Sequence, residues 1–157
     1  HRSAGIWEGE YTHIAPADRR VLELQRFRIR AEVFDSGPLN YRQTSHYWWP
    51  DGREEELQYT GVLRPSDDRM VFDTGRIRGE CWAIEPGTLY LWFGYSATPD
   101  VRVTEMIQLS PDGEHRARTW HWFRAHVLER ITLVRERRTS RDPADWPLVH
   151  RPPTLPI

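Results

Sequence analysis

The chain has 157 residues, which is enough for one domain built around one hydrophobic core. Its formal net charge of −1 excludes the basic surface that general nucleic-acid binding requires, so no nucleic-acid partner is expected. A single cysteine excludes an internal disulfide framework, and no apolar run is long enough for a transmembrane helix. No signal peptide is recognisable, and we expect a soluble, cytoplasmic protein.

Turn signals divide the chain at regular intervals. Clusters of Gly, Pro, Asp and Ser predict turns at 36–38, 51–52, 66–68, 73–75, 86–87 and 112–113. The segments between them are rich in β-branched and aromatic residues and predict strands at 5–14, 20–34, 39–49, 55–64, 69–73, 76–84, 88–97, 102–110, 114–123 and 128–138. No segment shows sustained helical periodicity, and 15–24 holds at most one short helical turn.

Antiparallel strands in hairpin succession predict an all-β fold. Their arrangement within residues 1–138 favours a single closed up-and-down barrel of about 8–10 strands, with a β-sandwich as the alternative. Residues 139–157 hold five of the twelve prolines and have no strand pattern. We expect this segment to be an extended tail that lies over the barrel or projects from it.

The turn at Asp112-Gly113 sets the register of its hairpin. A two-residue turn there pairs Glu105 with Trp120, and cross-strand partners share one face of a sheet. An acid and an arginine, Glu105 and Arg118, then lie diagonally within reach of each other among large apolar groups. The same face carries Val103, Ile107, Leu109, Arg116, Trp120 and Trp122.

The hairpin around Pro86-Gly87 predicts a similar face. A two-residue turn there collects Arg78, Glu80, Trp82, Ile84, Leu89, Leu91, Phe93 and Tyr95 on one side of the sheet. Acid, arginine and aromatic groups on two neighbouring hairpins are typical of a small-molecule pocket. Arg–Glu pairs packed against Trp are also common in structural scaffolds, and a slip of one residue in either register exchanges the faces.

The N-terminal segment "GIWEGEY" contains Gly5-x-Trp7 on the first predicted strand. A Gly-x-Trp on the first strand, followed by up-and-down strands and an arginine on the last strand, resembles the lipocalin/calycin superfamily. The resemblance implies that Trp7 packs at the closed end of the barrel beneath the late arginine, for which Arg135 and Arg137 are both candidates.

Several longer segments carry a second resemblance. They are "Y-x-Q" at 41–43, "WWPDG" at 48–52, "EMIQLSPDGEHRARTWHWF" at 105–123 and "LERITLVRERR" at 128–138. These segments are similar to a poorly characterised lipocalin-like domain family of cyanobacteria, fungi and other bacteria, which has a plastid relative involved in ATP-synthase assembly. The resemblance implies a calycin barrel but no agreed activity.

Metal and cofactor signals are weak. The seven histidines are scattered, without His-x-His, HExxH or Cys/His clusters, so no metal site is predicted. No cofactor is predicted, although "GIWEGEY" also resembles the opening of nitrobindin-type barrels, in which His121 or His126 would hold haem. Cys81 is expected on the face that carries Trp92, without a neighbouring base, which disfavours nucleophilic catalysis.

The predicted function is the binding of a hydrophobic or aromatic small molecule in the barrel lumen. Glu105 and Arg118 are the candidate catalytic pair for a cofactor-free acid–base isomerisation or cyclisation, because burial raises a carboxyl pKa and Arg118 opposes that rise. The candidate ligand-binding residues are Arg78, Glu80, Trp82, Phe93, Tyr95, Arg116, Trp120 and Trp122. A non-catalytic ligand carrier and a protein assembly factor are the alternative functions that stay open. A homodimer is the open alternative for the oligomeric state.

Overall fold

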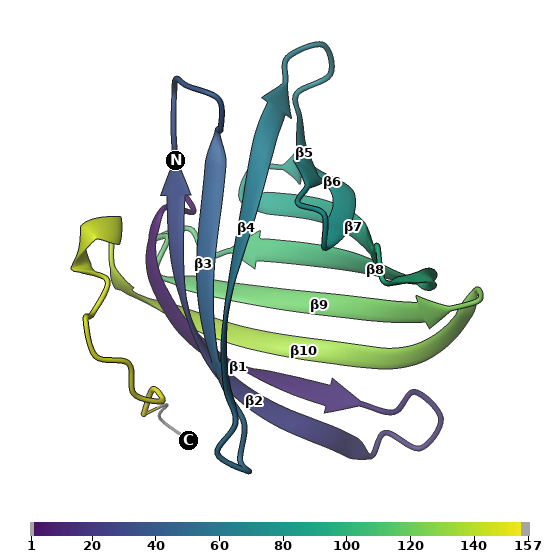
Figure 1. Ribbon diagram of the computed structural model, residues 1–157. Coiled ribbons are helices and arrows are strands. Elements are labelled where there is room, and N and C mark those ends of the chain that lie inside the picture. The colour runs from purple at the N-terminus through teal and green to yellow at the C-terminus, as the bar shows by residue number, and fades with distance from the viewer. Residues whose placement is uncertain (1, 155–157) are drawn as a thin grey trace.

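The computed structural model describes residues 2–154 and shows a closed barrel of antiparallel strands (Figure 1). Each strand pairs with its neighbours in the chain, and β1 closes the barrel by pairing with β10. The strands are β1 (Gly5–Ile14), β2 (Val21–Val33), β3 (Tyr41–Trp48), β4 (Glu54–Arg64), β5 (Arg69–Asp73), β6 (Ile77–Glu85), β7 (Thr88–Tyr95), β8 (Thr98–Leu109), β9 (His115–Arg124) and β10 (Val127–Ser140). The predicted up-and-down barrel is therefore confirmed, rather than the sandwich.

The predicted strands all occur, with differences at their ends. β8 begins at Thr98 rather than at residue 102, and β10 continues to Ser140, beyond its predicted end at 138. The polar end of β10 has no hydrophobic pattern, but Ser140 pairs with Ile6 of β1, so closure of the barrel supplies its strand partner. The described residues form a short helix at Pro143–Asp145, after the last strand. The segment 15–24, where one helical turn was considered, forms no helix.

The register predicted for the β8–β9 hairpin is confirmed. Glu105 pairs with Trp120, and Leu109 pairs with Arg116. The buried residues of both strands lie on the face that the alternation predicted, with Val103 and Glu105 almost inaccessible to solvent. This hairpin therefore presents its acid, arginines and tryptophans to the interior.

The register predicted for the β6–β7 hairpin is wrong by one residue. Glu85 pairs with Thr88, as a two-residue turn requires, but the next pair is Ala83 with Leu89. Ile84 is the extra residue of a β-bulge, which leaves two residues on one strand opposite one on the other. Because side chains alternate along a strand, the bulge exchanges the inner and outer faces of β6 relative to the prediction.

Trp7 packs inside the barrel beneath two guanidinium groups. Its side chain is fully buried, with the Arg116 guanidinium 3.9 Å from the ring centroid and that of Arg138 4.5 Å away. A tryptophan beneath a late arginine is thus present, but Arg138 of β10 takes the place predicted for Arg135 or Arg137. Alternation along β10 leaves those two residues exposed, so they cannot reach an inward-facing ring.

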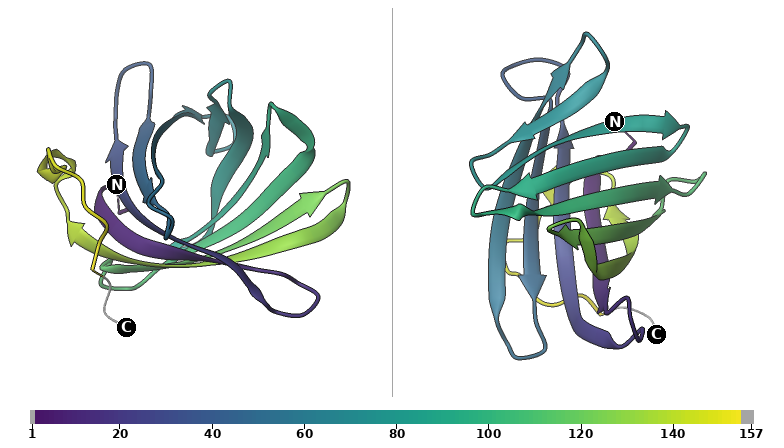
Figure 2. Two further views of the ribbon diagram at one scale, coloured as in Figure 1. Left: turned by 60° about the horizontal axis from the view of Figure 1, so that its bottom comes forward. Right: turned by 90° about the vertical axis from the view of Figure 1, so that its right-hand side faces the viewer.

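The C-terminal segment lies on the outside of the barrel, beside the strands β2 and β3. The guanidinium of Arg30 is 5.4 Å from the ring centroid of Trp146, and His150 stacks on His46 of β3 with 4.6 Å between ring centroids. Figure 2 shows this yellow segment running along the outer side of the curled sheet. No helix among residues 2–154 has the length and apolarity that a membrane-spanning helix needs.

A methyl group added at Gly79 should destabilise the barrel. Its Cβ would lie 2.0 Å from the carbonyl oxygen of Trp92 on the neighbouring strand, so the two backbones would have to move apart. We expect Gly79→Ala to lower the free energy of unfolding by about 2 kcal/mol in urea titrations. Gly94→Ala is the control, because its Cβ would approach Val101 only to 3.4 Å. Equal losses in the two variants would contradict this prediction.

Candidate functional site

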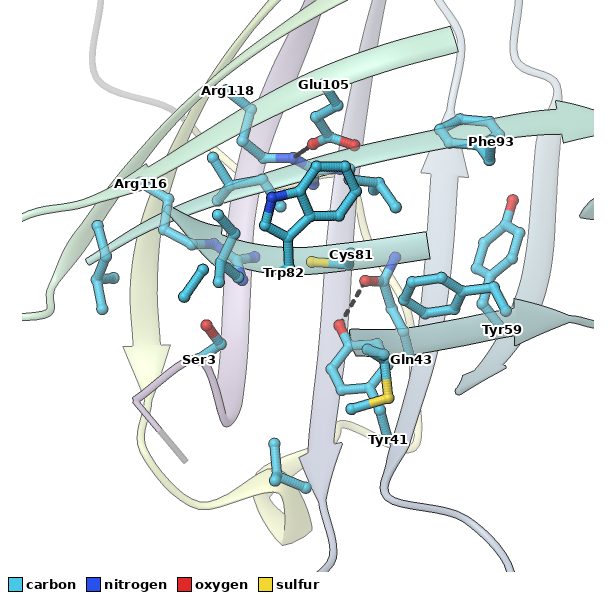
Figure 3. A pocket seen from close by; sticks show the side chains of 18 of the residues that line it. Ser3, Tyr41, Gln43, Tyr59, Cys81, Trp82, Phe93, Glu105, Arg116 and Arg118 are labelled. Atoms are coloured by element: carbon cyan, nitrogen blue, oxygen red, sulfur yellow. Dashed lines mark hydrogen bonds and ion pairs between the residues drawn. The ribbon is translucent and has the colours of Figure 1, made fainter. Parts of the chain in front are cut away.

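A cavity of about 600 Å³ occupies the interior of the barrel. Most of its wall is aromatic or aliphatic, and Figure 3 shows side chains from several strands converging on it. Pockets that hold drug-sized ligands measure about 300–1,000 Å³. The lumen is therefore not filled by the protein's own side chains, and its size suits a small organic molecule.

Trp120 of β9 is the centre of an aromatic wall. Its ring centroid lies 5.2 Å from that of Tyr11 on β1 and 5.6 Å from that of Trp122. Phe93 of β7 meets Trp120 edge to face, with centroids 6.0 Å apart and planes at 89°. Rings from three strands thus present a continuous apolar surface, which suits a ligand with an aromatic or polyene body.

A buried cluster of four charged groups interrupts this wall. Arg118 donates from Nε to Glu105 and from Nη1 to Glu136, the latter at 2.8 Å. Arg116 donates from Nε to the other oxygen of Glu136, also at 2.8 Å. All four side chains are at most 7% exposed. Buried charges persist only where they are paired and hydrogen-bonded, and here each carboxylate has at least one arginine partner.

The strand register explains how these four groups meet. Arg116 and Arg118 are two residues apart on β9 and therefore project to the same side of the sheet. Glu136 is the cross-strand partner of Arg116 on β10, while Glu105 lies diagonal to Arg118 on β8. The carboxylates thus flank the two arginines from opposite neighbouring strands. Figure 3 shows Glu105 and Arg118 together beside the cavity.

The two buried carboxyl groups have different pKa values. Burial raises the pKa of Glu105, and the one arginine that it contacts, Arg118, opposes this rise without cancelling it. Burial also acts to raise the pKa of Glu136, but Arg116 and Arg118 together outweigh it and hold that pKa below its usual value. Glu136 is therefore the more acidic of the two groups, and Glu105 is the group that more readily holds a proton.

Most of the predicted site residues border the cavity. They are Trp82, Phe93, Tyr95, Glu105, Arg116, Arg118 and Trp120. Trp122 lies one layer further along β9, where its Nε1 donates to Thr132 at 2.9 Å. Trp82 is at the border only, because its ring packs against Tyr90, with centroids 4.9 Å apart.

Arg78 and Glu80 are on the outside of the barrel. Arg78 is 77% exposed and pairs with Asp73 at 3.0 Å. Glu80 pairs with Arg64 at 3.0 Å and with Arg69 at 2.7 Å. The bulge in β6 is the reason, because it reverses the direction in which both side chains point.

The same bulge brings Cys81 to the cavity wall, on the face opposite to the one predicted. Its cross-strand partner is Leu91, not a residue on the face of Trp92. Burial raises the pKa of the Cys81 thiol to about 12, so the group is a neutral thiol at pH 7. A neutral thiol is a poor nucleophile.

The residues of β3 that border the cavity were not predicted from the sequence. Tyr41 donates to Gln43 Oε1 at 2.7 Å, and Gln43 Nε2 donates to Ser45 at 2.8 Å. Burial raises the pKa of Tyr41 to about 12, so its hydroxyl stays protonated. The alternation of Tyr41, Gln43, Ser45 and Tyr47 was the available signal. The turn predicted at 51–52 indicates which strand pairs with β3, but not which face of β3 is inside.

The histidines named for haem binding do not reach the lumen. His121 alternates with the inward-facing tryptophans of β9, and His126 is an exposed residue of the β9–β10 turn. Neither belongs to the described lining of the cavity. Outside the barrel, His46, Glu56 and His150 offer metal-ligand atoms within 4.8 Å of one another. Their sequence spacing does not reveal this cluster, because His150 comes from the C-terminal segment.

Comparisons with known proteins give the fold class. No family model matches the chain, and no curated protein matches it by sequence. The S-type phycobiliprotein lyase CPES from Guillardia theta matches with a TM-score of 0.67 and 17% identity, over 87% of this chain and 88% of that one.

Two other solved structures resemble the chain to a similar degree. A protein of unknown function from the DUF3598 family of Nostoc punctiforme matches with a TM-score of 0.64 and 17% identity, over 88% of this chain and 48% of that one. Rv2717c from M. tuberculosis matches with a TM-score of 0.60 and 15% identity, over 88% and 93%. The chain accordingly shares the fold of these solved structures, a closed barrel of antiparallel strands.

Proposed function

We propose that the protein binds a small molecule with a hydrophobic or aromatic body in the lumen of its barrel. The observation that carries the proposal is a cavity of about 600 Å³ with an aromatic wall and one buried polar cluster. Ligand pockets combine apolar walls with a few convergent polar groups that fix orientation. A barrel stabilised only by its own packing would not need such a volume inside it.

The polar cluster supplies the orienting contacts. Nη1 of Arg116 and Nη2 of Arg118 hydrogen-bond to no described residue, and both side chains border the cavity. Protonation of Glu105 gives the cluster a net positive charge, because two arginines then face one carboxylate. The preferred ligand is thus a molecule with a carboxylate or carbonyl oxygen at one end and a conjugated or aromatic body.

The unequal carboxyl groups support acid–base chemistry at the same place. A protonated Glu105 can give a proton to the ligand and take one back, while Arg118 stabilises negative charge on a ligand oxygen. This chemistry is a cofactor-free isomerisation or cyclisation. A carrier would use the same pocket and release its ligand unchanged, so product analysis separates the two functions.

The similarity to a phycobiliprotein lyase is consistent with a barrel that handles a small molecule, since a lyase of that name has this fold. We also propose that this chain is a member of the lipocalin-like domain family of cyanobacteria, fungi and other bacteria.

Retinoic acid is a suitable first probe, because it joins a conjugated apolar body to a carboxylate. We expect saturable quenching of tryptophan fluorescence by retinoic acid and weaker quenching by retinol. Cys81→Trp, which fills the lumen, should weaken binding at least about tenfold. Arg78→Trp adds the same side chain to the outer face of β6 and should bind normally. Equal binding by the two variants would place the ligand outside the lumen.

The two buried carboxyl groups should also differ in stability measurements. Glu136→Gln leaves two buried arginines short of their shared anion, so we expect a loss of about 3 kcal/mol in the free energy of unfolding at pH 7. Glu105→Gln should cost less than Glu136→Gln does, because Glu105 contacts one arginine and Glu136 contacts two.

The stabilisation that Glu136 provides should depend on pH. Its lowered folded pKa stabilises the protein above the unfolded pKa, and that stabilisation is lost as the pH falls through the folded value. The difference between Glu136→Gln and the parent protein should therefore shrink in acid, as urea titrations from pH 7 downward would show. A constant difference would mean that the ion cluster is not its source.

A further inference from the structure

Two histidines and two glutamates form a group on the outer face of the barrel, away from the lumen. His46 of β3 and Glu56 of β4 are cross-strand partners, and Glu54 lies two residues before Glu56 on the same face. His150 comes from the C-terminal segment and stacks on His46, with 4.6 Å between ring centroids and 19° between planes. The C-terminal segment thus meets two consecutive strands, β3 and β4, from which it is distant in the sequence.

The hydrogen bonding of His46 leaves one ring nitrogen without a partner. Nε2 lies 3.0 Å from Glu54 Oε2. A carboxylate only accepts, so Nε2 carries the proton and a neutral ring has its lone pair on Nδ1. Nδ1 is buried, has no hydrogen-bond partner among the described residues, and lies 3.6 Å from Glu56 Oε2. Two acceptors that face each other across this distance repel unless a proton or a metal ion lies between them.

His150 presents a second unsatisfied nitrogen at the same place. Its Nδ1 is also buried and hydrogen-bonds to no described residue. The stacked rings of His46 and His150 thus bring two unpaired ring nitrogens to the same place. A neutral imidazole is the form that binds metals.

We propose that His46, Glu56 and His150 bind a divalent transition-metal cation of the zinc type. Imidazole nitrogens and a carboxylate oxygen form a common ligand set for zinc, with water as a fourth ligand. Glu54 is the supporting group, because metal-binding histidines usually donate their second ring N–H to a carboxylate. This site is independent of the lumen and of any ligand bound there.

The three candidate ligand atoms need to move only a small distance to bind one metal ion. Ligand atoms around one tetrahedral zinc ion are about 3.3 Å apart, given metal–ligand bonds of about 2.0–2.1 Å. The three candidate atoms are within 4.8 Å of one another, and the pair from His46 and Glu56 is already at 3.6 Å. His150 makes the remaining movement, because it belongs to an irregular segment rather than to the sheet.

The surrounding charge also favours a cation. Glu54 and Glu56 bring two carboxylates to the site, and the nearest strand partner of His46 on β2 is Arg28. The Arg28 guanidinium pairs with Glu8 at 2.7 Å, and this carboxylate offsets the Arg28 charge near the site. The site is thus locally anionic despite the many arginines of β2.

Metal binding would fasten the C-terminal segment to the barrel. That segment is already held on both sides of His150, by Trp146 beneath Arg30 and by the Pro153 carbonyl, which accepts from Arg26 at 3.4 Å. A metal that binds only the docked segment adds its binding free energy to docking. The consequence is lower mobility of residues 142–153 in the presence of the ion.

Titration of the chelator-treated full chain with zinc chloride tests the proposal by calorimetry. We expect one ion per chain, with the affinity reduced at least about a hundredfold in His46→Gln and in His150→Gln, which each remove a ligand. Glu54→Gln should cost about tenfold to a hundredfold, as loss of a supporting group does. His115→Gln, at an exposed histidine on β9, is the control and should bind as the parent does.

Hydrogen exchange of residues 142–153 provides the second readout. Zinc should slow exchange in the parent and in His115→Gln but not in His150→Gln, and circular dichroism confirms that each variant is folded. The proposal is overturned if no stoichiometric zinc binding occurs. It is also overturned if His46→Gln and His150→Gln bind zinc as tightly as His115→Gln does.

Discussion

The pairing of β1 with β10 is the constraint on which the rest of the structure depends. It converts one face of a curled sheet into an interior, so every inward side chain must pack, pair or border a cavity. Gly9 shows how close the two strands are, because an added Cβ there would lie 2.2 Å from the Arg135 carbonyl oxygen. Closure also gives the polar end of β10 its partner, Ile6. Without closure the inward face would be an exposed apolar surface.

The buried ion cluster joins the scaffold to the candidate site. The cluster connects the neighbouring strands β8, β9 and β10 on the inner face of the barrel through Glu105, Arg118, Arg116 and Glu136. Arg116 also covers Trp7. Charges in such a place cost free energy unless each has a partner, so the cluster restricts how these strands can pack. The same arrangement gives an apolar cavity one polar region, and its two carboxyl groups differ in acidity because they share the arginines unequally.

The outer face of the barrel has its own organisation. The C-terminal segment covers parts of β2 and β3 and contributes Trp146 and His150 to ring contacts there. It brings His150 beside His46, a pairing between residues more than a hundred positions apart in the chain. The lumen and this outer cluster are separated by the sheet itself, because inward and outward side chains alternate along every strand.

The sequence by itself determined the barrel, because Asp-Gly and Pro-Gly turns and alternating apolar residues are local signals that survive without tertiary context. It also determined the inward face of β8 and β9, where an unbroken register carries alternation from the turn to Glu105 and Arg118. Only the tertiary structure decided the face of β6, since the bulge at Ile84 has no local signature and reverses Arg78, Glu80 and Cys81.

Tertiary structure alone also decided which distant residues meet. Arg138, and not Arg135 or Arg137, covers Trp7 because closure fixes the direction of β10 side chains. Glu136 joins Arg116 and Arg118 only through the β9–β10 register. His150 reaches His46 because an irregular segment folds back over the sheet, and no periodicity predicts where such a segment docks. Local chemistry thus set the strands and turns, while long-range pairing set the site.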